Sequence, residues 1–196
     1  MSTRRYDSPV RDEAAAATGA SIVRATVDLA YERGDIDMTL QQIAERAGTT
    51  VRTIMRQFGS RDAVIEAGIE LGSAEIVAER HDPGSDVDRS IALLVEHYER
   101  RGAFVLRILS QDQAGAMRVA DSGRHVHRAW VEEIFGPQLP PDASQRIELV
   151  DLLVVATDVY AWKLLRLDRG LDAATTVARI RRMTHLLIAG TSMKEE

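Results

Sequence analysis

The residues best suited to chemistry are arginines in a short segment without acidic side chains. Residues 46–61 contain four arginines and no aspartate or glutamate. These arginines are Arg46, Arg52, Arg56 and Arg61. A guanidinium is always charged, and its planar set of donors can bond to phosphate or to the acceptor edge of guanine. Residues 62–99 carry ten acidic residues against two arginines, so a basic segment within an acidic chain indicates contact with nucleic acid.

Two short helices joined by a glycine turn must position these arginines. Thr39 and Gln42 have the spacing of a capping box, which predicts a helix that begins at Leu40. Gly48 ends this helix, at a position where the backbone needs a positive φ. Thr49 or Thr50 then caps the second helix.

The second short helix buries Ile54 and Phe58, which are four residues apart. Its remaining side chains are Val51, Arg52, Thr53, Met55, Arg56 and Gln57. This is the form of a helix-turn-helix, whose second helix enters the major groove with its N-terminal residues at the base edges. Two packed helices of a plain bundle would have the same spacing, and the local charge favours the DNA interpretation.

Composition excludes several protein classes. The chain has 196 residues, 45% of them hydrophobic and 28% charged, which is typical of a globular protein. No run approaches the ~18 apolar residues of a membrane span, so we expect no membrane partner. The absence of cysteine excludes disulfides and thiolate chemistry. With no apolar run near Met1, we expect a cytoplasmic location.

The rest of the chain is predicted to be helical, which gives an all-α fold class. Ser8 and Pro9 predict the start of a first helix that ends at Arg33. Ser60 caps a helix over 61–79. Its apolar stripe is Val64, Ala67, Leu71, Ala74 and Ala78. After a break at 81–85, further helices are predicted at 86–101, 103–111, 114–135, 142–168 and 172–190.

Over about residues 18–68 the chain resembles the N-terminal DNA-binding domain of the TetR family of transcriptional regulators. The residues that carry the resemblance are Ile22, Leu29-Ala30, Gly34, Thr39, Ile43-Ala44, Ala47-Gly48, Thr53-Ile54, Phe58, Ser60-Arg61-Asp62 and Val64. The resemblance implies an N-terminal arm and three-helix helix-turn-helix domain at 1–62. It further implies a connecting helix and break at 63–84, and a helical effector-binding and dimerisation domain at 85–196.

The resemblance also assigns the DNA contacts. It implies that Thr39, Gln57 and Arg61 position the phosphates. The candidate base readers are Gln41, Thr50, Val51, Arg52 and Thr53. Arg52 can bond guanine O6 and N7 together, and Val51 can pack on a thymine methyl.

Met55 and Gln57 depart from the family pattern, although both stay within the predicted interface. Met55 stands where the family usually has a tyrosine, and it cannot donate a hydroxyl to phosphate. Gln57 stands where a histidine is often found, and its amide can still donate. Both departures concern the details of docking, not the motif.

The C-terminal half offers a dimer surface and a ligand pocket. The segment 147–167 is apolar around most of its circumference, so it must be covered on more than one side. The resemblance implies that it forms a four-helix dimer interface with the last helix; closing the monomer core is the alternative. The residues suited to a mostly apolar effector pocket are Tyr98, Phe104, Leu106, Met117, His127, Trp130, Asp158, Tyr160 and Trp162. Asp158 lies at the surface, is paired, or contacts the ligand, because an unpaired buried carboxylate is costly.

The sequence supports neither a metal site nor an enzyme. His125 and His127 point to different faces of a helix, and no third ligand follows. There is no nucleophile elbow, phosphate-cradling loop or zinc-protease motif. We therefore expect no cofactor and a homodimeric repressor that a small-molecule effector releases from a palindromic operator. The alternative is a helical scaffold that uses the helix-turn-helix for protein contact.

Overall fold

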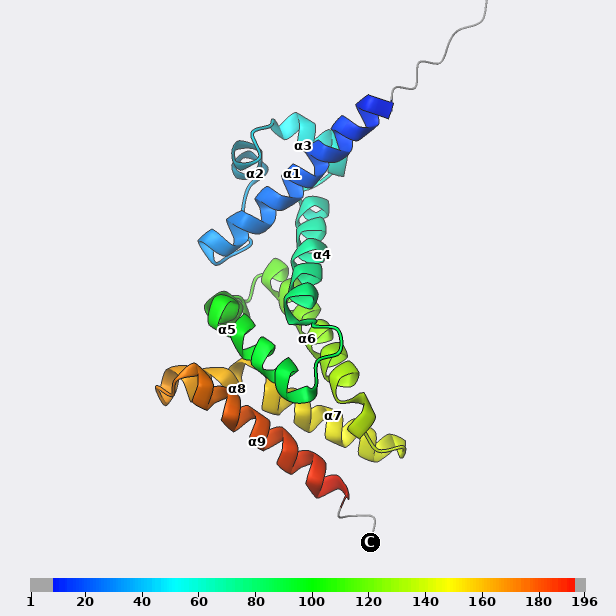
Figure 1. The fold of residues 1–196 in the computed structure, drawn as a ribbon. Helices are drawn as coiled ribbons and strands as arrows, with labels where there is room; N and C mark the ends of the chain where they lie inside the picture. The colour runs from blue at the N-terminus through cyan, green and yellow to red at the C-terminus, as the bar shows by residue number, and fades with distance from the viewer. Residues whose placement is uncertain (1–8, 193–196) are drawn as a thin grey trace, which may run out of the picture. The chain divides into compact units, whose positions relative to one another are not determined.

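A computed structural model describes residues 9–192 of the chain, and this part is helical without any strand (Figure 1). Its elements are α1 (Pro9–Arg33), α2 (Leu40–Arg46), α3 (Val51–Phe58), α4 (Arg61–Arg80), α5 (Val87–Leu109), α6 (Ala114–Ile134), the 3-10 helix η1 (Gly136–Gln138), α7 (Ala143–Thr157), α8 (Val159–Lys163), the π-helix η2 (Leu164–Asp168) and α9 (Ala173–Ser192). The predicted all-α fold is confirmed. The predicted cap Ser8 lies outside the described residues.

The chain forms two compact units. The first ends at Gly72 and the second begins at Ser73. The core of the first unit joins α1 to the two short helices and to the start of α4. Its fully buried side chains include Ile22, Ile43, Ile54 and Val64. Ile54 is therefore buried as predicted, whereas Phe58 is half-buried.

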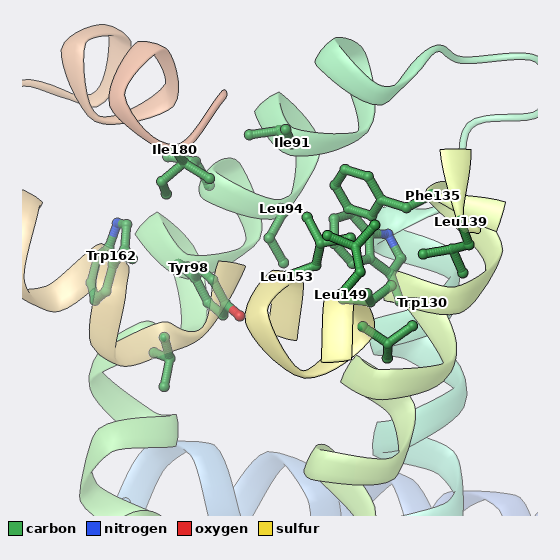
Figure 2. Packing of buried hydrophobic residues seen from close by; sticks show 14 residues of the cluster. Ile91, Leu94, Tyr98, Trp130, Phe135, Leu139, Leu149, Leu153, Trp162 and Ile180 are labelled. Carbon is green, nitrogen blue, oxygen red and sulfur yellow. The ribbon is translucent and has the colours of Figure 1, made fainter. Parts of the chain in front are cut away.

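The core of the second unit is built around α5, which packs against α6, α8 and α9. Ile91, Leu94 and Tyr98 of α5 meet Trp130, Phe135, Leu149, Leu153, Trp162 and Ile180 of the other helices (Figure 2). Trp130 meets Phe135 edge-on, with ring centroids 6.2 Å apart. This single apolar cluster holds α5–α9 together.

The prediction that Gly102 separates two helices is wrong, because α5 continues through it from Val87 to Leu109. A β-carbon at Gly102 would stand 2.5 Å from Cζ3 of Trp162. The glycine therefore lets the indole of α8 lie directly on the backbone of α5.

Gly102→Ala is expected to lower the free energy of unfolding by about 1–3 kcal/mol, the usual cost of overpacking a core. The indole cannot swing aside freely, since its Nε1 donates to Glu99 Oε1 at 2.8 Å. Gly123→Ala is the matched control, because a β-carbon there meets nothing within 4 Å in a helix of the same unit. Urea denaturation of both variants measures the difference, and equal stabilities would contradict the close contact.

The single helix predicted over 142–168 is also wrong, because the chain breaks at Asp158. Asp158 has extended backbone angles, and its carboxylate accepts a hydrogen bond from the Tyr160 amide at 2.8 Å. Asp158 is thus the half-buried N-cap of α8, and the Tyr160 amide is its hydrogen-bond partner. Beyond α8 the helix widens into the π-turns of η2, which end with Arg169 N donating to Leu164 O.

The predicted stripe of α4 is correct only in its first half. Val64 is fully buried, and Ala67 and Leu71 are half-buried, but Ala74 and Ala78 are exposed. The buried side chain at the end of the helix is instead a cation, which is described below.

Candidate nucleic-acid interface

Local hydrogen bonds define the helix-turn-helix. The capping box of α2 is present: the Gln42 amide donates to Thr39 Oγ1 at 3.2 Å, and the Thr39 amide donates to Gln42 Oε1 at 2.8 Å. Gly48 has a φ of 62°, as its place in the turn predicts. Thr50 is the cap of α3 and accepts from the Thr53 amide at 3.2 Å. The start of α3 is therefore fixed by side chains that the sequence identifies.

The predicted base readers fall into two groups. Arg52, Thr50 and Gln41 are exposed, whereas Val51 and Thr53 are half-buried. The hydroxyls of Thr50 and Thr53 are 3.0 Å apart and bond to each other, and the Gln41 amide donates to Glu45 at 2.8 Å. These polar groups already have partners within the unit.

Two exposed guanidinium groups on α3 are different. Within the described residues, Arg52 and Arg56 form no hydrogen bond or ion pair. Met55 lies between them in sequence and is 41% exposed. The face of α3 that carries Arg52, Met55 and Arg56 is hereafter called the α3 face.

The other two arginines of the basic segment are neutralised locally. Arg46 forms a two-pronged ion pair with Glu32 of α1, with distances of 2.7 and 2.8 Å. Arg61 pairs with Asp37 at 3.0 Å and also donates to the Met38 carbonyl at 2.7 Å. The unpaired charge of the segment is thereby concentrated on the α3 face.

The predicted phosphate contacts help to hold the unit together. Gln57 donates through Nε2 to the Ala15 carbonyl of α1 at 2.7 Å. Arg61 ties the start of α4 to the loop before α2, and the Thr39 side chain caps α2. These residues position α2 and α3, and their contact with phosphate stays a prediction.

The second unit brings together four of the predicted pocket residues. Tyr98, His127, Trp130 and Trp162 are buried in its core. The Tyr98 hydroxyl donates to the Thr157 carbonyl at 3.1 Å, and His127 Nε2 lies 3.1 Å from Thr157 Oγ1. The break after Thr157 is what frees its carbonyl from helical bonding.

The remaining pocket residues lie elsewhere. Met117 and Tyr160 are 55% and 49% exposed. Phe104, Leu106 and Asp158 are half-buried. A separate surface cavity of about 600 Å³ is lined by residues that include Asp86, Asp88 and His185, and by none of the predicted pocket residues.

The sequence analysis missed four polar residues in the neighbourhood of Tyr98. Arg80, at the end of α4, is only 6% exposed, and His97 is fully buried. His97 Nδ1 lies 2.8 Å from Glu79 Oε2, and Arg101 Nε donates to Glu79 Oε1 at 3.1 Å. A cation in the last turn of a helix is so common that nothing in the sequence marks Arg80 as buried.

The surroundings shift the pKa values of this polar group strongly. Burial lowers the pKa of His97 to about 4, and the charge of Arg80 contributes. Burial and Arg80 likewise lower the pKa of His127 to about 4. Burial alone would raise the pKa of Glu79, but hydrogen bonds from Arg101 and His97 outweigh it and bring the value to about 2. The histidines are therefore neutral and Glu79 is ionised at neutral pH.

Two further kinds of site are absent from residues 9–192. No group of three or more histidines and carboxylates in this part of the chain is arranged to hold a metal ion. No helix within it is long and apolar enough to cross a membrane.

Several solved structures share this fold. A transcriptional regulator from Rhodococcus sp. RHA1 matches with a TM-score of 0.61 and 13% identity over 88% of this chain and 96% of that chain. A TetR transcriptional regulator from the same organism matches with a TM-score of 0.55 and 17% identity over 90% and 97%. FadR of Thermus thermophilus, a TetR-family repressor solved with lauroyl-CoA, gives a TM-score of 0.49 and 20% identity over 87% and 93%.

The sequence comparison bears directly on the helix-turn-helix. No curated protein matches the chain significantly. The sequence profile of the bacterial regulatory proteins of the tetR family matches residues 22–67, which run from α1 through α2 and α3 into α4. These residues include Arg52, Met55 and Arg56 and both helix caps. The resemblance to the TetR family of bacterial transcriptional regulators that the sequence shows is thus confirmed for residues 22–67.

Proposed function

We propose that this regulator is a homodimeric repressor that binds a palindromic operator and leaves it when a small molecule binds. The observation that carries the proposal is the α3 face, where two guanidinium groups without protein partners stand on a well-capped helix. An unpaired, exposed guanidinium can contact DNA without breaking any bond within the protein, whereas Arg46 would first have to leave Glu32.

On this proposal α3 enters the major groove. Arg52, in the first turn of α3, bonds a guanine, and Val51 packs on a thymine methyl. Gln41, Thr50 and Thr53 contribute at the groove edge, while Thr39, Gln57 and Arg61 face the phosphates. Met55 contributes apolar contact in place of a hydroxyl donor.

A second copy of the chain is the proposed partner of α7 and α9. These two helices pack against each other, yet they leave large apolar side chains in solvent. Ile147, Leu152 and Val155 on α7 and Leu186 on α9 are 43–69% exposed. An exposed apolar surface of this kind marks an interface, and a two-fold dimer presents two recognition helices to two half-sites.

We assign DNA binding to residues 1–62, the connection to residues 63–84, and effector binding and dimerisation to residues 85–196. An effector releases DNA only if it favours a dimer geometry whose α3 helices no longer match the half-site spacing. Operator DNA must then weaken the effector by the same factor. A protein with this function works in the cytoplasm, where bacterial DNA lies.

The test is to recover the genomic DNA that the purified chain selects from sheared fragments and to measure its affinity. A short, two-fold symmetric sequence bound with strong salt dependence is expected. Binding that shows no preference for any fragment would contradict the proposal and would favour a scaffold that uses α3 for protein contact.

Arg52→Ala is expected to cost about 1–3 kcal/mol per half-site and to relax the preference at one base pair. The reason is the loss of the guanidinium from the base edge, with no change in the fold, because Arg52 has no partner within residues 9–192. Fluorescence anisotropy with a set of single-base operator variants measures both effects.

The control for this experiment is Arg33→Ala, which removes another exposed arginine, at the end of α1, that pairs with Asp35. It should leave operator affinity nearly unchanged. A loss that is uniform over all the operator variants would assign Arg52 to phosphate instead of a base.

A further inference from the structure

The core of the second unit contains polar atoms that the protein leaves without hydrogen bonds. They are Nε and Nη1 of Arg80, Nε2 of His97, Nδ1 of His127 and Nε1 of Trp130. Each is buried, and none has a partner among the residues described. Buried polar groups are normally paired, so a set of five such atoms on four residues of α4, α5 and α6 requires an explanation.

Arg80 has the greatest need of a partner among these residues, because it carries a charge. Its guanidinium is almost fully buried, and its Cζ lies 5.4 Å from the centre of the Tyr98 ring. Burial lowers its pKa, although an arginine stays charged in proteins. The Tyr98 ring face offers some stabilisation, but a buried cation is costly without an anion.

The carboxylates of the same region do not neutralise Arg80. Glu79 is bound by Arg101 and His97, and Asp158 caps α8. Both act on the Arg80 charge through space, yet within residues 9–192 neither forms an ion pair with it. The protein thus contains a buried positive charge near two carboxylates that form their hydrogen bonds with other groups.

The other orphaned atoms surround the same position. Tyr98 connects these groups, because its ring lies 5.4 Å from Arg80 Cζ and its hydroxyl bonds to Thr157, which also bonds to His127. The His127 ring stacks on Trp130, with centroids 5.8 Å apart and planes at 12°. His97 and Tyr98 are adjacent rings with centroids at 5.6 Å. The polar atoms therefore share one aromatic-walled region formed by α4, α5 and α6.

The ring nitrogens can be assigned from their partners. Thr157 Oγ1 donates to the Leu153 carbonyl at 2.7 Å, so it accepts from His127 Nε2 and leaves Nδ1 without a proton. His97 donates from Nδ1 to the Glu79 carboxylate, which leaves its Nε2 bare. The region thus offers a fixed cation, one indole donor and two acceptors.

We propose that Arg80 is the anchor of a buried effector site that binds an organic monocarboxylate with an apolar body. A single cation matches a single negative charge, and a carboxylate has the planar shape that pairs best with a guanidinium. The Trp130 indole donates to a second oxygen of the ligand, and the rings of Tyr98, His127 and Trp130 enclose its body. That this ligand is the effector rests on the function proposed above.

The experiment measures carboxylate binding to the full chain without DNA. The probes are butyrate, octanoate and phenylacetate, each compared with its primary amide by calorimetry at pH 7.5. The amide keeps the size and the apolar body but removes the charge. At least one carboxylate is expected to bind 10-fold or more tightly than its amide, because only the charged form offsets Arg80. Equal binding of every acid and amide, or no binding by any acid, would overturn the proposal.

Variants of Arg80 supply a second, ligand-independent measurement. Arg80→Met is expected to abolish the preference for the acid and also to raise the melting temperature of the ligand-free protein, because it removes an uncompensated buried charge. Arg80→Lys should keep part of the preference. Arg89→Met, which removes an exposed arginine paired with Asp82, is the control and should change neither quantity.

The two proposals can fail separately. A lower melting temperature in Arg80→Met together with an unchanged acid preference would show that Arg80 is a structural residue and would overturn the anchor. Operator binding is measured on the same protein without acids. A chain that binds DNA and no acid refutes only the carboxylate site, and a chain that prefers acids and binds no DNA refutes only the repressor.

Discussion

Acidification from pH 7 to pH 4 is expected to remove about 3 kcal/mol of unfolding free energy for each of two buried histidines. His97 and His127 have a pKa of about 4 in the folded protein against 6.5 in the unfolded chain. Between pH 6.5 and about 4, these histidines are protonated in the unfolded chain but stay neutral in the folded protein. The stabilisation is therefore complete above pH 6.5, falls with pH, and is lost near pH 4.

Glu79 extends this loss to lower pH. Its pKa of about 2 lies below its ordinary value of 4.5, so its contribution is present above pH 4.5 and declines below it. The free energy of unfolding should consequently fall most steeply with pH between about 4.5 and 4, where the histidines and Glu79 both take up protons. Urea titrations at half-unit steps from pH 7.5 to 4 measure the curve.

Two conservative variants isolate the histidines. His97→Asn keeps a donor in the place of Nδ1 toward Glu79, and His127→Gln keeps one in the place of Nε2 toward Thr157. Each should remove about half of the pH dependence between 6.5 and 4. His125→Gln, at an exposed position two residues from His127, should leave the curve unchanged. A variant curve parallel to that of the original protein would refute the assignment.

Val155→Glu is expected to dissociate the proposed dimer and to weaken operator binding by about 100-fold or more, because two linked DNA-binding units bind far more tightly than one. Val155 is 69% exposed on α7, so the glutamate costs the monomer little. At a two-fold interface the substitution buries two unpaired carboxylates. Sedimentation measures the mass, and anisotropy measures the operator affinity.

The choice of residue decides whether this test is clean. Leu187 belongs to the apolar stripe of the last helix, but it packs against the core cluster, so a charge there would unfold the unit. Leu186, at 62% exposure, is the equivalent position on α9. Met117→Glu places the same charge on an exposed apolar residue of α6 and is the control. A Val155→Glu protein that stays dimeric would move the interface away from α7.

The parts of the fold that local chemistry decides could be predicted from sequence. The caps Thr39 and Thr50 and the turn at Gly48 depend only on residues a few positions away, and each lies where its spacing indicated. Such signals are short-range hydrogen bonds and backbone preferences, which the sequence displays directly.

The parts of the fold that tertiary contacts decide could not be predicted from sequence. Gly102 was expected to end a helix because glycine is a poor helix former, yet a partner 60 residues away makes its missing side chain necessary. The sequence predicts that Asp158 lies within a continuous apolar helix. In the structure the helix is broken there, and Asp158 caps the new helix α8. Arg80 and His97 carry no local sign of burial, because their surroundings come from helices distant in sequence.

The sequence separation of these contacts also sets an order of events during synthesis. In the first unit the bonds Gln57–Ala15 and Arg61–Met38 join residues at most 42 positions apart. In the second unit Arg181 of α9 reaches back 93 positions to the Asp88 carbonyl. Since domains fold as they leave the ribosome, the first unit, which carries α2 and α3, is complete well before α9 is synthesised. The proposed dimer surface, which includes Leu186, is made last. A newly folded first unit is therefore monomeric until α9 has been synthesised. On the function proposed above, weak affinity for a single half-site would keep such nascent chains from occupying the operator before they can respond to an effector.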